Sequence, residues 1–160
     1  MAGKTKALKE AEVDGPFDLD ILADLVGYQL HRAEIDSYRR FMKLSGKLKV
    51  TPKQFSALVL IGANPDLSQT ELRKLLGMDR ATTAVLIAAL ADRDLLERQR
   101  STLDRRRHKL RLTKHGKGVL KKMKLRVRTH DEQLTSQLTS RERRALASLL
   151  SKIRSSDENS

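Results

Sequence analysis

Basic side chains are concentrated in one segment of the chain, where they are suited to bind phosphate. Residues 98–128 include fourteen lysines and arginines but a single acidic residue, Asp104. Basic and acidic residues balance in the rest of the chain, so this segment holds the entire formal net charge of +13. A concentrated positive field attracts a polyphosphate backbone. A solvated basic face that keeps the protein soluble is the alternative, but the near exclusion of acidic residues favours nucleic acid as the partner.

Residues able to catalyse a reaction or bind a metal form no recognisable motif. The sequence has no Ser-His-Asp order, no paired carboxylates and no glycine-rich phosphate loop. His108, His115 and His130 lack the spacing of metal ligands, and the chain has no cysteine to complete a site. The sequence therefore predicts a protein that is not an enzyme and that needs neither a cofactor nor a metal.

The hydropathy pattern and the N-terminal residues predict a cytoplasmic protein. No apolar run approaches the roughly 18 residues that a membrane span needs. The first fifteen residues are charged and lack the apolar stretch of a signal peptide. We therefore expect no contact with a membrane.

Apolar spacing and capping residues predict a mainly α-helical fold. Ser68 with Glu71 three residues later forms a capping box, and Thr51 precedes a proline at the first helical position. The other expected caps are Asp18 or Asp20, Asp79 and Thr113, and Ser140 with Arg141 and Glu142 is expected to open the last helix. We expect helices at about 20–44, 52–62, 69–76, 80–93, 114–134 and 140–153.

A change from helical to alternating periodicity predicts a β-hairpin within the basic segment. Residues 95–98 and 109–112 are the expected strands, and the second alternates polar and apolar side chains as a half-buried strand does. Residues 101–104 are the expected turn, followed by three consecutive arginines. Arginines at a hairpin tip are placed to reach a phosphate or a narrow minor groove.

Helices 69–76 and 80–93, joined by a tight turn at Gly77, predict a helix-turn-helix. In this motif the second helix enters the major groove and presents its first residues to base edges. Arginine forks onto guanine, and threonine donates a hydrogen bond or touches a thymine methyl group. Capped helices with a short turn also occur in ordinary bundles, and the adjacent basic hairpin favours DNA binding over that alternative. The predicted DNA-binding residues are Ser68, Gln69, Arg80, Thr82, Thr83, Asp104, Arg105, Arg106 and Arg107.

Three motifs follow one another in a fixed order along the chain. Residues 67–72 are LSQTEL, followed by LLG at 75–77, and residues 90–97 are LADRDLLE. The third motif is DRR at 104–106, followed by LT at 112–113 and by Gly116. Their combination and order, over residues 18–153, resemble the MarR (multiple antibiotic resistance) family of transcriptional regulators.

The resemblance implies a winged helix-turn-helix homodimer that binds a pseudo-palindromic DNA site through two lobes. Arg106 matches the wing-tip arginine that enters the minor groove in this family, and Asp104 matches the acid that orients it through a hydrogen bond. The chain departs from the family pattern at two places. Ala84 and Val85 stand where many relatives carry Thr and Arg, and Asp94 replaces a glycine in the turn before the wing, where a left-handed conformation is less favourable for aspartate.

Apolar residues outside the DNA-binding region predict a homodimer. The first helix carries two apolar stripes, whereas a surface helix needs only one. The last helix carries a further stripe at Leu146, Leu149, Leu150 and Ile153. We therefore divide the chain into a flexible N-terminal arm (1–15), an N-terminal dimerisation helix (16–50), a winged helix-turn-helix DNA-binding domain (51–113), C-terminal dimerisation helices (114–154) and a tail (155–160).

Polar and aromatic residues of the first helix are candidates for an effector site, because arginine binds a carboxylate or phosphate in a fork. These residues are Tyr28, His31, Arg32, Tyr38 and Arg39, and exposed charges or interface groups are the alternative. The resemblance implies repression that ends when a small aromatic or carboxylate ligand binds. The chain has features in common with regulators of aromatic-acid catabolism, some of which sense an aromatic acid as its coenzyme A thioester. The sequence thus predicts a ligand-responsive transcriptional repressor, with a non-specific architectural DNA- or RNA-binding protein as the alternative.

Overall fold

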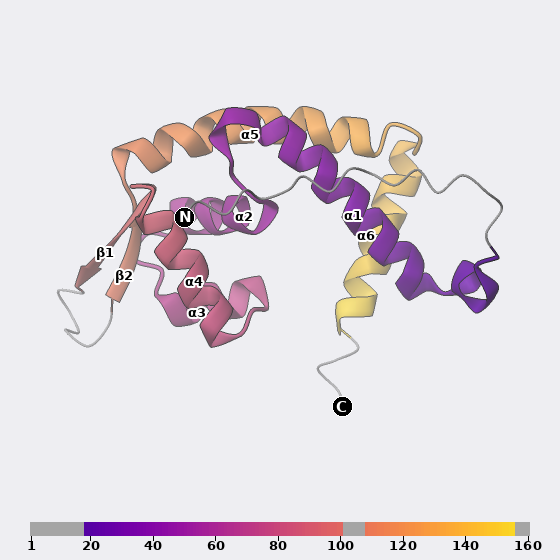
Figure 1. Cartoon of the computed structure of the whole chain (residues 1–160), viewed down its shortest axis with the longest axis horizontal. Coiled ribbons are helices and arrows are strands. Elements are labelled where there is room, and N and C mark those ends of the chain that lie inside the picture. The colour runs from indigo at the N-terminus through magenta and orange to yellow at the C-terminus, as the bar shows by residue number, and fades with distance from the viewer. Residues whose placement is uncertain (1–17, 101–107, 156–160) are drawn as a thin grey trace, which may run out of the picture. The chain divides into compact units, whose positions relative to one another are not determined.

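The computed structural model describes residues 18–100 and 108–155, and the chain divides into two compact units. The N-terminal unit (Met1–Glu34) contains a 3₁₀ turn at Asp20–Asp24 and the first part of helix α1 (Val26–Ser45). The C-terminal unit (Ile35–Ser160) contains the end of α1 and all later elements of the described chain (Figure 1).

Helices form most of the C-terminal unit. A 3₁₀ turn at Gly46–Leu48 follows α1, and the later helices are α2 (Pro52–Ala63), α3 (Gln69–Leu76), α4 (Arg80–Ala91), α5 (Lys114–Leu134) and α6 (Ser140–Ser155). Strands β1 (Leu96–Arg100) and β2 (His108–Leu112) pair antiparallel, with Leu96 opposite Leu112. A mainly helical chain with a two-stranded sheet between α4 and α5 confirms the predicted winged helix-turn-helix fold.

Side-chain caps fix the starts of four helices where the sequence predicts them. Thr51 and Ser68 each complete a capping box, and Asp79 and Thr113 each accept a backbone N–H of the following turn with a side-chain oxygen. These bonds satisfy amide groups that a helix start otherwise leaves unpaired. The predicted caps of α2, α3, α4 and α5 are thereby confirmed.

The predicted start of the first helix at Asp18 or Asp20 is wrong, because α1 begins at Val26. The carboxylate of Asp18 accepts the backbone N–H of Asp20 at 2.9 Å, and Asp20, with a φ of 48°, begins a separate 3₁₀ turn that precedes α1. Helix α6 begins at Ser140, as the sequence predicts, and Thr139 caps it. The hydroxyl oxygen of Thr139 accepts the N–H of Glu142 at 3.3 Å, and the Glu142 carboxylate accepts the N–H of Thr139 at 2.7 Å.

The core of the C-terminal unit joins the helix pair α3–α4 to the sheet and to α5. Apolar side chains of α2, α3, α4, both strands and α5 form a buried cluster, in which Leu58, Leu72, Ile87 and Leu110 are fully buried. The carbonyl oxygen of Leu67, just before α3, accepts the N–H of Leu110 in β2 at 2.9 Å. The strands are thereby held against the helix pair by both apolar packing and a backbone bond.

The turn between α4 and β1 depends on two special residues. Asp94 has a φ of 52°, so an aspartate adopts the left-handed conformation that glycine adopts most readily. The hydroxyl of Thr113 donates a hydrogen bond to the carbonyl oxygen of Asp94. A Cβ atom at Gly116 would lie 1.9 Å from the carbonyl oxygen of Leu95. The lack of a side chain at position 116 therefore allows α5 to pack against the start of the sheet.

Candidate nucleic-acid interface

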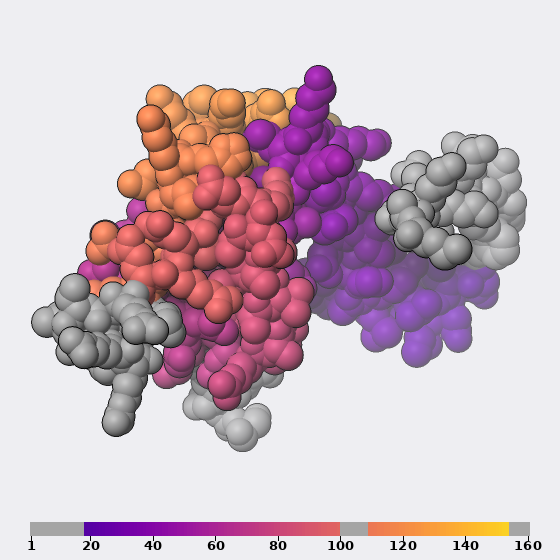
Figure 2. All heavy atoms as spheres, turned by 60° about the vertical axis from the view of Figure 1, so that its left-hand side comes forward, coloured from indigo at the N-terminus to yellow at the C-terminus, as the bar shows by residue number. Residues whose placement is uncertain are grey.

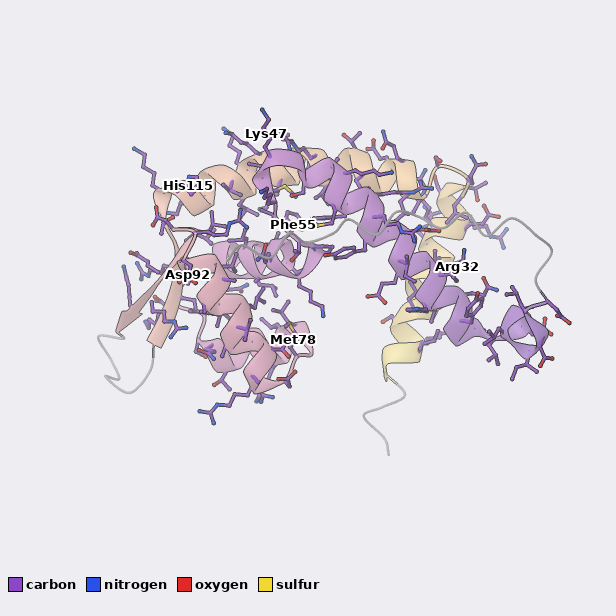
Figure 3. All side chains as sticks on the ribbon, viewed as in Figure 1. Arg32, Lys47, Phe55, Met78, Asp92 and His115 are labelled. Atoms are coloured by element: carbon purple, nitrogen blue, oxygen red, sulfur yellow. The ribbon has the colours of Figure 1, made fainter. Side chains whose placement is uncertain are left out.

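Helices α3 and α4 form a helix-turn-helix. Gly77 ends α3 with a φ of 61°, a left-handed conformation that glycine adopts without strain. The N–H of Met78 donates to the carbonyl oxygen of Arg73 at 3.1 Å. Figure 3 shows Met78 in the turn between the two helices and Asp92 at the far end of α4. The structure thus confirms α4 as the second helix of the predicted motif.

Helix α4 has a buried face and an exposed face. Its buried residues are Thr83, Leu86, Ile87 and Leu90. Its exposed residues are Arg80, Ala81, Thr82, Val85 and Ala88. Since the second helix of a helix-turn-helix enters the major groove, the exposed face is the part of α4 that a base edge can contact.

The structure excludes Thr83 from the residues that contact bases. Its side chain is 0% exposed, and its hydroxyl donates to the backbone carbonyl of Asp79 at 2.7 Å. The prediction for Thr83 is wrong because helical periodicity places this position on the same side as the core residues Leu86, Ile87 and Leu90.

Thr82 is exposed, but its hydroxyl is bound to the helix cap. It donates to the carboxylate of Asp79. This bond and the backbone N–H of Thr82 hold the pKa of Asp79 below its usual value of 3.8, so Asp79 remains ionised at neutral pH. A hydroxyl that has donated its only hydrogen offers DNA an acceptor oxygen and a methyl group. Arg80, also exposed, is the cation of the first turn of α4.

Ser68 and Gln69 lie half-buried at the start of α3. The hydroxyl of Ser68 donates to the carboxylate of Glu71 at 2.6 Å and accepts the N–H of Glu71 at 3.2 Å. The capping box therefore uses the hydrogen that Ser68 would donate to a phosphate. A DNA contact by Gln69 stays a prediction.

An ion-pair cluster ties the basic strand β2 to the loop before α3. The carboxylate of Asp66 contacts Nζ of Lys109 at 3.1 Å and a guanidinium nitrogen of Arg111 at 2.8 Å. The hydrogen bond from Arg111 is the largest cause that holds the pKa of Asp66 below its usual value of 3.8, and the hydrogen bond from Lys109 is the second. No sequence motif marks Asp66, because Arg111 lies 45 residues further along the chain. The cluster fixes the side chains of β2 next to the helix-turn-helix.

The two strands place basic side chains beside the helix-turn-helix. Strand β1 contacts α4, and Figure 2 shows their surfaces adjoining on the side that faces the viewer. Arg98 in β1 and Arg111 in β2 are both exposed. The predicted contacts at Asp104, Arg105, Arg106 and Arg107 lie outside the described residues and stay predictions.

A groove of about 470 Å³ lies between α5, the end of α2 and the end of β2. Its apolar lining consists of Gly62, Leu112, Leu120 and Leu125. Its basic lining consists of Lys117, Lys121, Lys124 and Arg128, which recur at helical spacing along one side of α5. This spacing is visible in the sequence and is the signal that marks the groove. The lining, which includes no acidic residue, suits a molecule with an apolar part and several negative charges.

The five residues predicted to bind a ligand are not among those that line this groove. Tyr28, His31 and Arg32 belong to the N-terminal unit, where the guanidinium of Arg32 donates to the hydroxyl of Tyr28 at 3.4 Å. Tyr38 and Arg39 belong to the C-terminal unit and are exposed, and Arg39 forms an ion pair within α1. A ligand contact by these residues stays a prediction.

Two kinds of site are absent from the described part of the chain. No helix within residues 18–100 and 108–155 is long and apolar enough to cross a membrane. Those residues also include no group of three or more His, Cys, Asp or Glu side chains that could hold a metal ion.

Comparison with known proteins relates this chain to DNA-binding regulators. The sequence model of the MarR family matches residues 48–107. A protein of Thauera aromatica named "Putative transcriptional regulatory protein for hcr operon" is 30% identical over 133 residues, which are 82% of this chain and 80% of that protein. The transcriptional repressor CouR bound to a 23-mer DNA duplex has 38% sequence identity and a TM-score of 0.81, covering 88% of this chain and 99% of that chain. CouR bound to p-coumaroyl-CoA has 36% identity and a TM-score of 0.81, covering 87% of this chain and 98% of that chain.

Proposed function

Because this chain belongs to the MarR family of DNA-binding transcriptional regulators, we propose that it is a homodimeric repressor that leaves its operator when an aromatic acyl-coenzyme A thioester binds. The observation that carries the proposal is the helix-turn-helix of α3 and α4, which presents the exposed face of α4 beside a basic hairpin. In this proposal the protein acts on cytoplasmic DNA and catalyses no reaction.

In the proposed interface, the elements that supply affinity for any DNA differ from the element that supplies preference for one DNA sequence. Arg98 and Arg111 on the strands, with the three arginines at 105–107 in the sequence between the strands, supply positive charge for phosphate. Helix α4 supplies the contacts with base edges. Phosphate contacts give affinity that falls with salt, and base contacts give the preference for one sequence. The similarity to CouR bound to a DNA duplex supports this division.

Apolar side chains on α6 support the homodimer. Leu146, Leu149, Leu150 and Ile153 are all exposed in the single chain. A continuous apolar stripe of this kind marks a surface that a partner covers. Dimerisation through residues 16–50 and 114–154 would set two copies of α4 about one helical turn of DNA, roughly 34–36 Å, apart. Two equivalent helices at that spacing require a pseudo-palindromic operator.

The groove beside α5 is the proposed effector site. A free aromatic acid carries one carboxylate, for which a single cation is sufficient. Coenzyme A carries a pyrophosphate and a further phosphate group, which match the four cations of the groove better. The apolar lining, including Leu120 and Leu125, suits the aromatic acyl group. CouR bound to p-coumaroyl-CoA supports this class of effector.

Binding in the groove would act on the hairpin through β2. Leu112, the last residue of β2, lines the groove. A second hollow of about 290 Å³ shares Gly62, Leu112 and Lys117 with the groove and extends to Glu97 and Arg111. In this proposal a polyanion in the groove adds negative charge next to β2 and weakens the attraction between the cations of β2 and DNA phosphate. Effector and operator therefore weaken each other, and the two effects are equal in free energy.

Selection of tight-binding duplexes from a random library tests the DNA part of the proposal. We expect a pseudo-palindromic consensus that binds the dimer at least about 10³-fold more tightly than a scrambled duplex does. Fluorescence anisotropy on both duplexes measures this ratio. Equal affinity for the two would refute the repressor and favour an architectural DNA-binding protein.

Titration of candidate effectors into the operator complex tests the ligand part. We expect p-coumaroyl-CoA to release the operator at concentrations at which p-coumarate, acetyl-CoA and free coenzyme A leave it bound. Release by p-coumarate at the same concentration as by its thioester would refute the thioester as the effector class.

Paired variants of α5 test whether the groove is the effector site. Changing both Lys121 and Lys124 to Gln should weaken thioester binding in calorimetry without DNA. Lys114→Gln with Lys122→Gln is the matched control, because it removes the same charge from the same helix outside the lining of the groove. An equal loss in both pairs would mean that total charge, and not the groove, holds the ligand.

A further inference from the structure

The centre of the exposed face of α4 is apolar. Ala81, Val85 and Ala88 recur at i, i+4 and i+7, a spacing that places them along one side of the helix. Val85 is 70% exposed, the largest value among the exposed large hydrophobic residues of the described chain. The most prominent side chain on the DNA-facing side of α4 therefore has only methyl groups to offer.

Hydrogen-bonding groups lie at the edge of this face or are already engaged. The hydroxyl of Thr82 donates to Asp79, and Thr83 is buried. Arg80 is the first residue of α4 and is exposed. Alanine and valine side chains have no donor or acceptor. Base recognition along the middle of α4 must therefore use apolar contact.

The base-specific apolar group in the major groove is the C5-methyl of thymine. Guanine, adenine and cytosine present ring nitrogens, carbonyl oxygens or amino groups there. Burying such polar groups against valine without a hydrogen-bond partner is unfavourable. Val85 thus favours thymine both by its contact with the methyl group and by the cost of replacing thymine with a polar edge.

We propose that Val85 is a specificity-determining residue that recognises thymine methyl groups in each half-site of the operator, with Ala81 and Ala88 allowing close approach. The inference rests on the proposed function, since it requires a DNA operator. In this inference, apolar packing on Val85 causes the preference for thymine at the base pairs that α4 contacts. Arg80 then remains available to bind a guanine or a phosphate.

Deoxyuridine substitution tests the inference on the DNA side, because deoxyuridine lacks the methyl group and keeps the O4 acceptor and the pairing edge of thymine. Each thymine of the selected operator is replaced in turn, and affinity is measured by anisotropy. We expect a loss of about fourfold for each methyl group that packs on Val85. A scrambled duplex should show no dependence on the same replacement.

Substitution of Val85 tests the inference on the protein side. Val85→Ala should lower affinity for the thymine operator and leave affinity for the matching deoxyuridine operator nearly unchanged, because the two changes remove one contact. Val85→Ile keeps the methyl groups and should keep the preference for thymine over deoxyuridine. Leu75→Ala, which truncates an exposed leucine on α3, is the control and should leave this preference unaltered.

The outcomes separate this inference from the proposed function. Equal affinity for thymine and deoxyuridine at every position, on an operator that is still selected, overturns the role of Val85 and leaves the repressor intact. A deoxyuridine effect that persists undiminished in Val85→Ala also overturns it, because the methyl group is then recognised elsewhere. Failure of the library to yield any consensus overturns the proposed function itself.

Discussion

Replacing Gly116 by alanine tests how closely α5 packs against the start of the sheet. The added Cβ would lie 1.9 Å from the carbonyl oxygen of Leu95 and 3.1 Å from its Cα. Non-bonded heavy atoms are most favourable at about 3.5–4.0 Å, so the turn or the helix must move by roughly 1.5 Å. Both crowded atoms belong to the backbone, and no rotation of a side chain can relieve the contact.

Two opposing terms set the expected change in the free energy of unfolding. Overpacking costs about 1–3 kcal/mol, and the upper end applies where the neighbouring atoms cannot yield. Alanine in place of glycine in a helix gains about 1 kcal/mol. We expect Gly116→Ala to lower the free energy of unfolding by about 2 kcal/mol, which corresponds to a fall in Tm of roughly 4–8 °C.

Gly118 offers a matched control in the same helix, because nothing lies within 4 Å of a Cβ atom built there. Gly118→Ala should raise the free energy of unfolding by up to about 1 kcal/mol. Urea denaturation of both variants at one fixed protein concentration measures the difference, since the stability of a dimer depends on concentration. Equal stability of the two variants would refute the close packing of α5 on Leu95.

Three further changes address the DNA interface and the dimer. Arg106→Ala should weaken operator binding by about 1–3 kcal/mol and random-duplex binding by a different amount, because minor-groove insertion depends on groove width; unchanged affinity in gel-shift titrations would exclude this arginine from the wing contact. Asp66→Asn releases two cations of β2 from their ion pairs, so random duplex should bind more tightly and the preference for the operator should fall in the same titrations. The pKa of Asp66 lies below 3.8, so its ion pairs with Lys109 and Arg111 persist at any pH above 3.8 and are lost only as the pH falls through the lowered pKa. Titration of Asp66 should therefore not alter the operator preference between about pH 5 and 8. Leu149→Asp should convert the dimer to a monomer in sedimentation velocity, and a dimer of unchanged affinity would exclude α6 from the subunit interface.

Most helix starts could be predicted because a cap binds amides only a few residues away. The capping box of Ser68 is visible in the sequence for this reason. The same spacing rule also identifies the cap of α6, because Thr139 lies three residues before Glu142. The separate turn before α1 could not be predicted in this way, since it depends on the positive φ of Asp20, a conformation that aspartate adopts only occasionally.

The candidate site divides into features of one helix and features that join distant segments. The burial of Thr83 follows from its spacing to Leu86 and Leu90, so the helical period alone was sufficient to remove it from the predicted contacts. Asp66 is different, because its partners in β2 come close only when the loop before α3 meets the sheet. Long-range ion pairs of this kind have no periodic signature, and the tertiary structure is needed to find them.

Most of the positive charge lies on other elements than the face of α4 that is proposed to read bases. Had the centre of α4 carried arginine, affinity for any phosphate backbone and recognition of bases would reside in one helix. Here Val85 occupies that centre and Arg80 lies at the start of the helix, while the other cations assigned to phosphate or to the effector lie on the strands and on α5, where the groove opens. In the proposed mechanism a bound polyanion therefore weakens the electrostatic part of DNA binding, which all sequences share, without touching the face that distinguishes the operator. Release of the operator then depends on lowering the total affinity for DNA. Weaker attraction to a few phosphates at each lobe is sufficient for this, and the geometry of base recognition stays unchanged.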